Sequence, residues 1–162
     1  MAIVVEDGTI VSGANSYVTE AELDSYAGAR GITISAGQQE EDLIKAMDVI
    51  EYIPLPGIKY TKAQPLQWPR EGVVIDGFDI LVTEIPDLLK EVQYEAAIAI
   101  DTGYDPLAIV TRVKESVSVG SISVKYANNS PDSRIYTPLW NKVARLLSNN
   151  PNNGFEFEVS PA

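Results

Sequence analysis

The segment from Ile85 to Gly103 constrains the fold more than any other, because it predicts a helix that is apolar on most of its surface. It begins at Ile85-Pro86-Asp87, where proline is tolerated in a first turn and an aspartate favours the positive end of the helix dipole. It ends at Gly103, a residue type that adopts the left-handed conformation found after many helices. Apolar residues recur between these ends at helical spacing: Leu88, Leu89, Val92, Ala96, Ala99 and Ile100. A helix of this kind is buried on most sides, so we expect it at the centre of a small bundle.

Three further amphipathic segments predict helices around the central one, at about residues 20–29, 38–52 and 138–147. Thr19 and Glu22 form a capping-box pattern at the start of the first, and Ser35 with Gln38 gives a weaker cap for the second. The acidic residues of the second helix are interpreted mostly as its solvated face: Glu40, Glu41, Asp42, Asp48 and Glu51. The expected fold is therefore mainly α, a small four-helix bundle with a long loop after the second helix and a β-hairpin between the third and fourth.

Residues 54–84 show little periodicity and are expected to form that long loop. Loops of this length inside a compact domain are usually functional or packed by their own side chains. The structural motif of this loop is Trp68-Pro69-Arg70. We expect Trp68 to fill space in the bundle and Pro69 to set the direction of the loop. Arg70 is expected to bind backbone carbonyls or a carboxylate, because its planar guanidinium suits either.

Residues 110–127 alternate between apolar and polar types around Gly120-Ser121, which predicts a β-hairpin with a type II′ turn. In the predicted register Val117 lies opposite Val124 and Glu115 lies opposite Tyr126. An isolated two-stranded ribbon is marginally stable in water, so this hairpin must lean on the bundle or on another subunit. The candidate subunit-contact residues are those of its apolar face: Val117, Val119, Ile122, Val124 and Tyr126.

The sequence divides into a helical domain, residues 1–148, and a C-terminal tail, residues 149–162. The first part of the tail is rich in Asn and Pro and predicts a flexible connection. Its second part alternates, so that Phe155, Phe157 and Val159 can share one face. Two alternatives remain open for this segment: a partner captures it as an added strand, or it folds back on its own subunit.

Most catalytic and cofactor chemistry has no candidate residues in this sequence. It contains no histidine and no cysteine, which removes the commonest general base, the commonest zinc ligands and the usual nucleophile pairs. Asp76 and Asp79 lack the spacing of a calcium-binding loop. We expect no enzymatic activity, no cofactor, no metal and no membrane partner, since no apolar run approaches the length of a membrane span.

The charge of the chain opposes binding to nucleic acid phosphates, because the net charge is −11. It is unevenly distributed, with 19 acidic and 6 basic residues in positions 1–109 but 6 basic and 2 acidic residues in positions 110–148. The basic excess is typical either of a solvated mixed surface or of a face that meets an acidic neighbour. Lys125-Tyr126 is the nearest approach to a basic groove with aromatic residues, and a packed ribbon explains it better.

Four motifs occur in an order that resembles a known family: VEDGT…GANSYVT near the start, QPLQWPR-x-GV in the loop, the IP before the central helix and VGSISVKY in the hairpin. The chain resembles, over about residues 3–148, the tailed-phage and prophage proteins labelled DnaT-like single-stranded DNA-binding. The order of its expected elements also resembles that of phage head-to-tail connector adaptors.

The connector resemblance implies a structural protein of the virion neck, present in the host cytoplasm during assembly. Its partners would be itself, in a ring of about twelve copies, the portal protein, and the tail or stopper protein. Double-stranded DNA would pass through the ring without tight binding, which the acidic charge favours. The portal-contact candidates are Phe155, Phe157 and Val159. The label of the family implies the alternative, a replication protein that binds single-stranded DNA.

Overall fold

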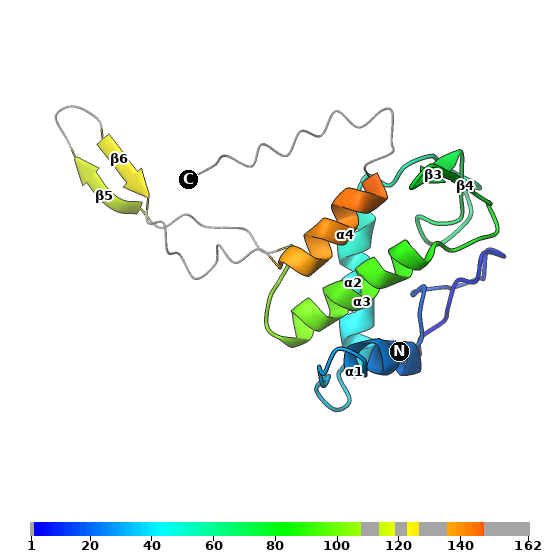
Figure 1. Ribbon diagram of the computed structural model, residues 1–162, viewed down its shortest axis with the longest axis horizontal. Helices are drawn as coiled ribbons and strands as arrows, with labels where there is room; N and C mark the ends of the chain where they lie inside the picture. Colours follow the sequence, from blue (N-terminus) through cyan, green and yellow to red (C-terminus); the bar gives the residue numbers. More distant parts are fainter. Residues whose placement is uncertain (1, 108–113, 119–122, 127–135, 148–162) are drawn as a thin grey trace.

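A computed structural model describes residues 2–107, 114–118, 123–126 and 136–147. In these residues the chain forms four helices and three two-stranded antiparallel sheets (Figure 1). The helices are α1 (Glu20–Gly28), α2 (Gln39–Tyr52), α3 (Asp87–Asp101) and α4 (Thr137–Leu147). The strands are β1 (Ile58–Lys59), β2 (Arg70–Glu71), β3 (Val73–Ile75), β4 (Phe78–Ile80), β5 (Lys114–Ser118) and β6 (Ser123–Tyr126). No helix of this described part is long and apolar enough to span a membrane.

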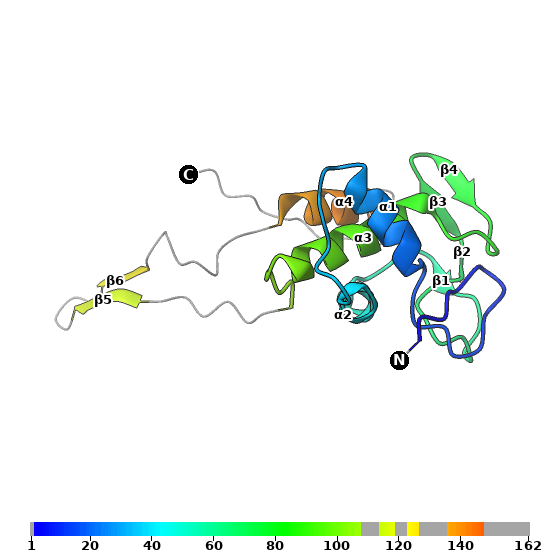
Figure 2. The ribbon, with the colours of Figure 1, turned by 90° about the horizontal axis from the view of Figure 1, so that it is seen from below.

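The central position predicted for the helix after Ile85 is confirmed, since α3 lies between α2 and α4 and contacts both (Figure 2). Its residues from Val92 to Ala99 are all buried, including Gln93 and Glu95. Small alanines at positions 96, 97 and 99 have almost no exposed surface, so neighbouring segments approach α3 closely. Gly103 has a φ of 83°, the left-handed conformation expected after the helix.

The predicted four-helix bundle is wrong, and the fold is a mixture of helices and short sheets. In Figure 2 α2 is seen end-on while α3 and α4 lie lengthwise, so α2 crosses the other two instead of running beside them. Helical periodicity indicates which residues are buried but carries no information on the angle at which two helices cross. The second source of the error is the segment between α2 and α3, which is not one irregular loop.

That segment contains four of the strands. Ile58 pairs with Glu71 and Lys59 with Arg70 in the β1–β2 sheet, and β3 pairs with β4 through an adjacent hairpin. Strands of two or three residues are too short to show an alternating pattern. The hairpin nevertheless has a sequence signature in Asp76-Gly77, whose φ angles of 52° and 85° are those of a two-residue loop with both residues left-handed. This Asp-Gly pair could have found the hairpin.

The other helices differ from expectation in details that concern their caps. The Thr19–Glu22 capping box at the start of α1 is confirmed. The weaker cap predicted for α2 is wrong, because Gln38 at that position makes no side-chain hydrogen bond to the helix. The sequence predicted that Asp42 lies on the solvated face of the second helix. This is wrong, because Asp42 is only 3% exposed.

The ribbon formed by β5 and β6 confirms the predicted hairpin in its described strands, and Val117 pairs with Val124 as expected. An irregularity between Lys114 and Ser116 shifts the register, so Lys114 and not Glu115 pairs with Tyr126. The predicted contact residues Val119 and Ile122 lie outside the described residues, as do Phe155, Phe157 and Val159 of the tail.

Candidate functional site

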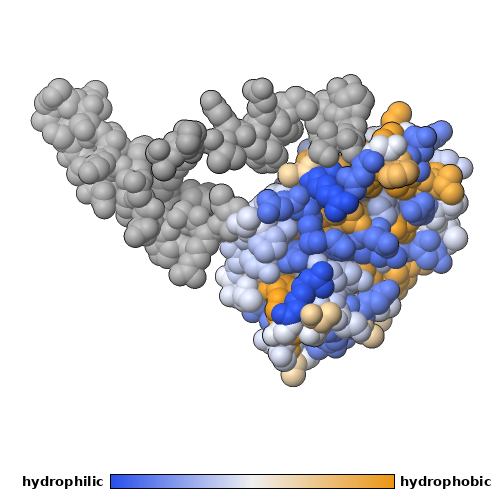
Figure 3. Space-filling model, in the orientation of Figure 1, coloured by the Kyte–Doolittle hydropathy of each residue, from blue (hydrophilic) through white to orange (hydrophobic). Residues whose placement is uncertain are grey.

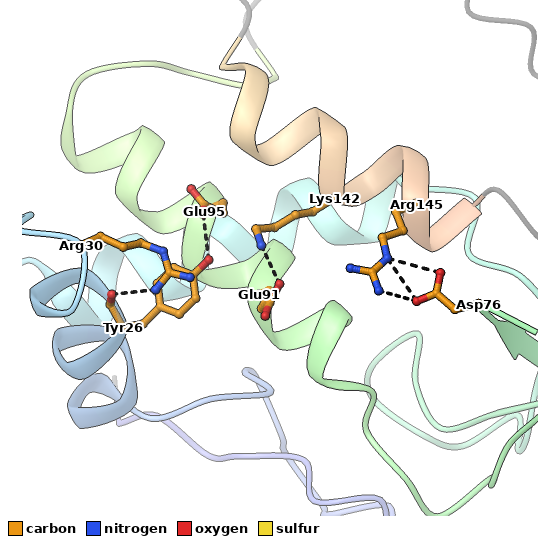
Figure 4. Close-up of polar contacts among 7 residues, drawn as sticks. All are labelled: Tyr26, Arg30, Asp76, Glu91, Glu95, Lys142 and Arg145. Atoms are coloured by element: carbon orange, nitrogen blue, oxygen red, sulfur yellow. Dashed lines mark hydrogen bonds and ion pairs between the residues drawn. The ribbon is translucent and has the colours of Figure 1, made fainter. Parts of the chain in front are cut away.

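A row of polar contacts crosses one face of the molecule from α1 to the β3–β4 hairpin (Figure 4). We call it the charged row, and its members are Tyr26, Arg30, Asp76, Glu91, Glu95, Lys142 and Arg145. Three helices contribute to the row: α1 supplies Tyr26, α3 supplies the carboxylates of Glu91 and Glu95, and α4 supplies the cations. Figure 3 shows hydrophilic residues over α3 and α4 on this face, with hydrophobic residues gathered near β3 and β4.

The α1 end of the row is built on Tyr26. Its hydroxyl donates a hydrogen bond of 2.7 Å to the Glu95 carboxylate, and its ring stacks on Tyr94 with centroids 4.5 Å apart. The guanidinium of Arg30 lies 3.4 Å from the Tyr26 ring centroid and donates to the Tyr26 carbonyl oxygen. Burial and the adjacent Glu95 carboxylate both raise the pKa of Tyr26, so the phenol stays protonated. Both faces of this ring are occupied, which leaves no free stacking surface.

The other end of the row fastens α4 to the rest of the fold. Lys142 lies 2.5 Å from the Glu91 carboxylate of α3, and Arg145 forms a salt bridge with Asp76 in the β3–β4 turn. The Arg145 guanidinium lowers the pKa of the Asp76 carboxyl. The Arg145–Asp76 pair is exposed, so its contribution to the stability of the fold is small. Its effect is positional, because the C-terminal end of α4 is held beside the hairpin.

The predicted loop motif, Trp68-Pro69-Arg70, leads directly into β2, whose first residue is Arg70. Trp68 is fully buried; its backbone N–H donates to the Tyr17 hydroxyl at 2.9 Å and its indole N–H donates to the Glu84 carbonyl oxygen at 2.7 Å. Pro69 follows through a cis peptide bond. Of the two partners left open for Arg70, the structure shows carbonyls: its guanidinium donates to the carbonyl oxygens of Leu55, Pro56 and Gly57 at 2.6–3.0 Å. These contacts join the loop to Tyr17 and to the segments around residues 55–57 and 84.

Glu6 and Gln93 are two of the buried polar residues that sequence reasoning missed, because both look like ordinary surface residues. Glu6 is 1% exposed and its carboxylate accepts hydrogen bonds from the backbone N–H groups of Gly8, Ile10 and Val11. Gln93 lies inside the core among apolar neighbours. The position of Gln93 on the otherwise apolar central helix is the one signal that could have identified it.

No described residues form a group of three or more carboxylates that could hold a metal ion. The Asp76 carboxylate forms a salt bridge with Arg145. Asp42 has one buried carboxylate oxygen without a hydrogen bond. Burial, with Asp101 nearby, raises the pKa of Asp42 to about 6. Asp42 and Asp101 are not joined by a third described carboxylate in a group that could hold a metal ion.

The ribbon brings basic and aromatic residues of distant sequence positions into one pair of strands. Lys114 pairs with Tyr126, and Ser116 pairs with Lys125. Lys114 and Lys125 belong to the segment of the chain with an excess of basic residues. In contrast, the cations of the charged row are engaged by Tyr26, Glu91 and Asp76. The ribbon therefore contains both residue types, basic and aromatic, that proteins use to bind single strands.

Comparison with known proteins gives a match to a family model. The family model described as "Putative DnaT-like ssDNA binding protein" matches residues 1–160. Among curated proteins and solved structures nothing matches the chain. The family match thus spans both the helical domain with its ribbon and most of the tail.

Proposed function

Because the chain belongs to the DnaT-like single-stranded-DNA-binding family over residues 1–160, we propose that it binds single-stranded DNA. The family match is the observation that carries this proposal. It favours the replication-type function that the sequence left as the alternative to a connector. The description of the family concerns binding alone and names no reaction.

The binding element in this proposal is the β5–β6 ribbon. Proteins that bind single strands without sequence preference combine cations along the backbone path with aromatic side chains on which bases stack. The ribbon supplies Lys114 and Lys125 and pairs the first of these with Tyr126. The residues of the charged row are poorly suited to this role, because the ring of Tyr26 is covered by Arg30 and Tyr94.

The net charge of −11 limits the affinity that this arrangement can reach. The acidic body repels a polyanion. Contacts of the ribbon lysines with phosphates release counterions, so the affinity that they supply falls as salt rises. We therefore expect binding to be weak at physiological salt and measurable at low salt.

Fluorescence anisotropy with a labelled oligothymidine, titrated at several salt concentrations, tests the proposal. The double substitution Lys114→Gln/Lys125→Gln removes two phosphate contacts, so the slope of log Kobs against log salt should become shallower by about 1.4. The matched control is Lys59→Gln/Lys62→Gln, which removes two exposed lysines of the helical body. Absence of binding by the unaltered protein at low salt, or equal effects of the two double substitutions, contradicts the proposal.

A second candidate function is the head-to-tail connector, a ring of this chain in the virion neck between the portal and the tail or stopper. Two observations favour it. An acidic ring suits a channel through which DNA passes without sticking, and the chain carries a net charge of −11. The ribbon lies apart from the four helices in Figure 1, and a ribbon of two strands needs support from another surface. In a ring that surface is the neighbouring subunit.

Deletion of residues 116–123 separates the connector from the single-strand binder. In a connector the shortened protein should keep its helical circular dichroism but fail to form rings visible by electron microscopy. Phe78→Ser, an exposed substitution in the β3–β4 hairpin, serves as the control and should leave rings intact. Rings from the deletion variant, or none from the unaltered protein, argue against the connector.

A further inference from the structure

An apolar groove lies where α2 meets α4. Its walls include Val49 and Tyr52 from α2, Trp140 and Leu147 from α4, and Leu107 from the segment after α3, and it encloses about 100 Å³. Tyr52 is 77% exposed and Leu107 is 40% exposed. The groove adjoins a larger hollow of about 430 Å³ that shares Val49 and Leu107 with it. Large exposed apolar side chains around a concave surface are typical of a site that another segment covers.

We propose that the segment Phe155–Val159 of the same chain occupies this groove in the isolated protein. Leu147, the last described residue before the tail, is itself part of the groove wall. The tail therefore starts at the site that it is proposed to cover. This choice decides between the two alternatives left open for the tail, since it places the segment on its own subunit.

The chain between Leu147 and Phe155 is long enough for the tail to turn back and reach the groove. Seven residues, positions 148–154, separate Leu147 from Phe155, and an extended chain of seven residues spans up to about 23–25 Å. The eleven residues of α4 are only about 16 Å long at 1.5 Å per residue. The connection can therefore turn back and run along α4 as far as Trp140. Its asparagines, proline and glycine are residue types that turns require.

The chemistry of the segment matches that of the groove. In an extended backbone successive side chains point to opposite sides, so Phe155, Phe157 and Val159 share one face while Glu156 and Glu158 share the other. The apolar face can cover Tyr52 and Leu107 and insert one aromatic ring into the groove. The two carboxylates then remain in solvent, where they cost nothing.

Trp140 makes the proposal measurable in the full-length protein. It lines the groove, whereas Trp68, the other tryptophan, is fully buried and is much less accessible to acrylamide. If the segment covers the groove, Trp140 is protected from acrylamide. The double substitution Phe155→Ser/Phe157→Ser should abolish this protection, and so should Tyr52→Glu, at a site exposed enough to leave the fold unchanged.

Phe78→Ser is the matched control, because it removes an exposed aromatic side chain outside the groove. A synthetic peptide of residues 149–162, added to the Phe155→Ser/Phe157→Ser variant, should restore protection in a saturable manner, and Tyr52→Glu in that background should prevent this. Quenching that is unchanged by the double substitution overturns the proposal. So does protection that fades on dilution, since it assigns the groove to a second copy of the chain.

Discussion

The side-chain amide of Gln93, fully buried on α3, accepts a hydrogen bond of 2.9 Å from the backbone N–H of Tyr17, 76 positions earlier in the chain. The same amide donates to the Ser16 hydroxyl at 2.8 Å and to the Leu43 carbonyl oxygen of α2 at 3.2 Å. One side chain thus satisfies polar groups of the N-terminal segment and of α2 from within the central helix. The Gln93 side chain thereby holds the N-terminal segment and α2 in position relative to α3.

Replacing Gln93 with leucine should destabilise the protein although it makes the helix more apolar. The change leaves the buried Tyr17 N–H without a partner and removes one from the Leu43 carbonyl, and each stranded group costs about 1–3 kcal/mol. Urea denaturation followed by circular dichroism measures the loss. The control Gln38→Leu, at an exposed position before α2 whose side chain does not cap the helix, should change stability little. Equal midpoints for the two variants would show that the Gln93 amide is not structurally important.

Arg70→Lys keeps the positive charge but should lower the melting temperature clearly. A lysine ammonium cannot reach the carbonyl oxygens of Leu55, Pro56 and Gly57 in the geometry of the planar guanidinium, and each buried carbonyl left alone costs about 1–3 kcal/mol. The conservative control is Arg30→Lys, since Arg30 is exposed. A melting temperature for Arg70→Lys that equals the control contradicts this account of the loop.

Ala96→Asp should unfold the domain. Ala96 has no exposed surface, so the new carboxylate would be buried without a partner, at a cost of several kcal/mol. Ala21→Asp introduces the same side chain at an exposed position in the first turn of α1 and should be tolerated. Thermal melts of the two variants test the prediction, and a cooperative transition of Ala96→Asp near that of the unaltered protein refutes it.

The raised pKa of Asp42 leads us to expect a specific dependence of the free energy of unfolding on pH. Its pKa is raised in the folded protein from 3.8 to about 6 by burial and by Asp101, with Lys45 acting in the opposite direction. Between these values the folded state binds more protons at this site than the unfolded state, so its contribution to stability falls as pH rises from about 4 to 6. Urea denaturation across this range measures the change.

The isosteric substitution Asp42→Asn removes this titration. The variant should be more stable than the unaltered protein above pH 6, and its stability should vary less between pH 4 and 6. Asp48→Asn is the control, because Asp48 is an exposed aspartate of the same helix. If both substitutions change the pH profile alike, the effect belongs to the overall charge and not to the buried carboxyl.

Local patterns in the sequence were sufficient for the helices and their burial. The Thr19–Glu22 cap, the apolar stripes of all four helices and the central place of the segment after Ile85 follow from interactions between residues close in sequence. The hairpin of β5 and β6 follows from alternation and a glycine turn in the same way. Its register was wrong by one residue at Tyr126, because a strand irregularity has no sequence pattern of its own.

The tertiary structure alone decided the features that depend on residues far apart. These features are the crossing of α2 over α3, the burial of Gln93 and Asp42, and the charged row that joins α4 to α3. Each depends on contacts between segments that are dozens of positions apart. A polar residue has the same local pattern whether it faces water or pairs across the core, so sequence periodicity places Asp42 on the surface. Whether such a residue faces water or pairs across the core depends on the groups that tertiary packing places opposite its side chain. The sequence by itself therefore determined which segments are helical and apolar, and packing determined how they cross and which polar groups they enclose.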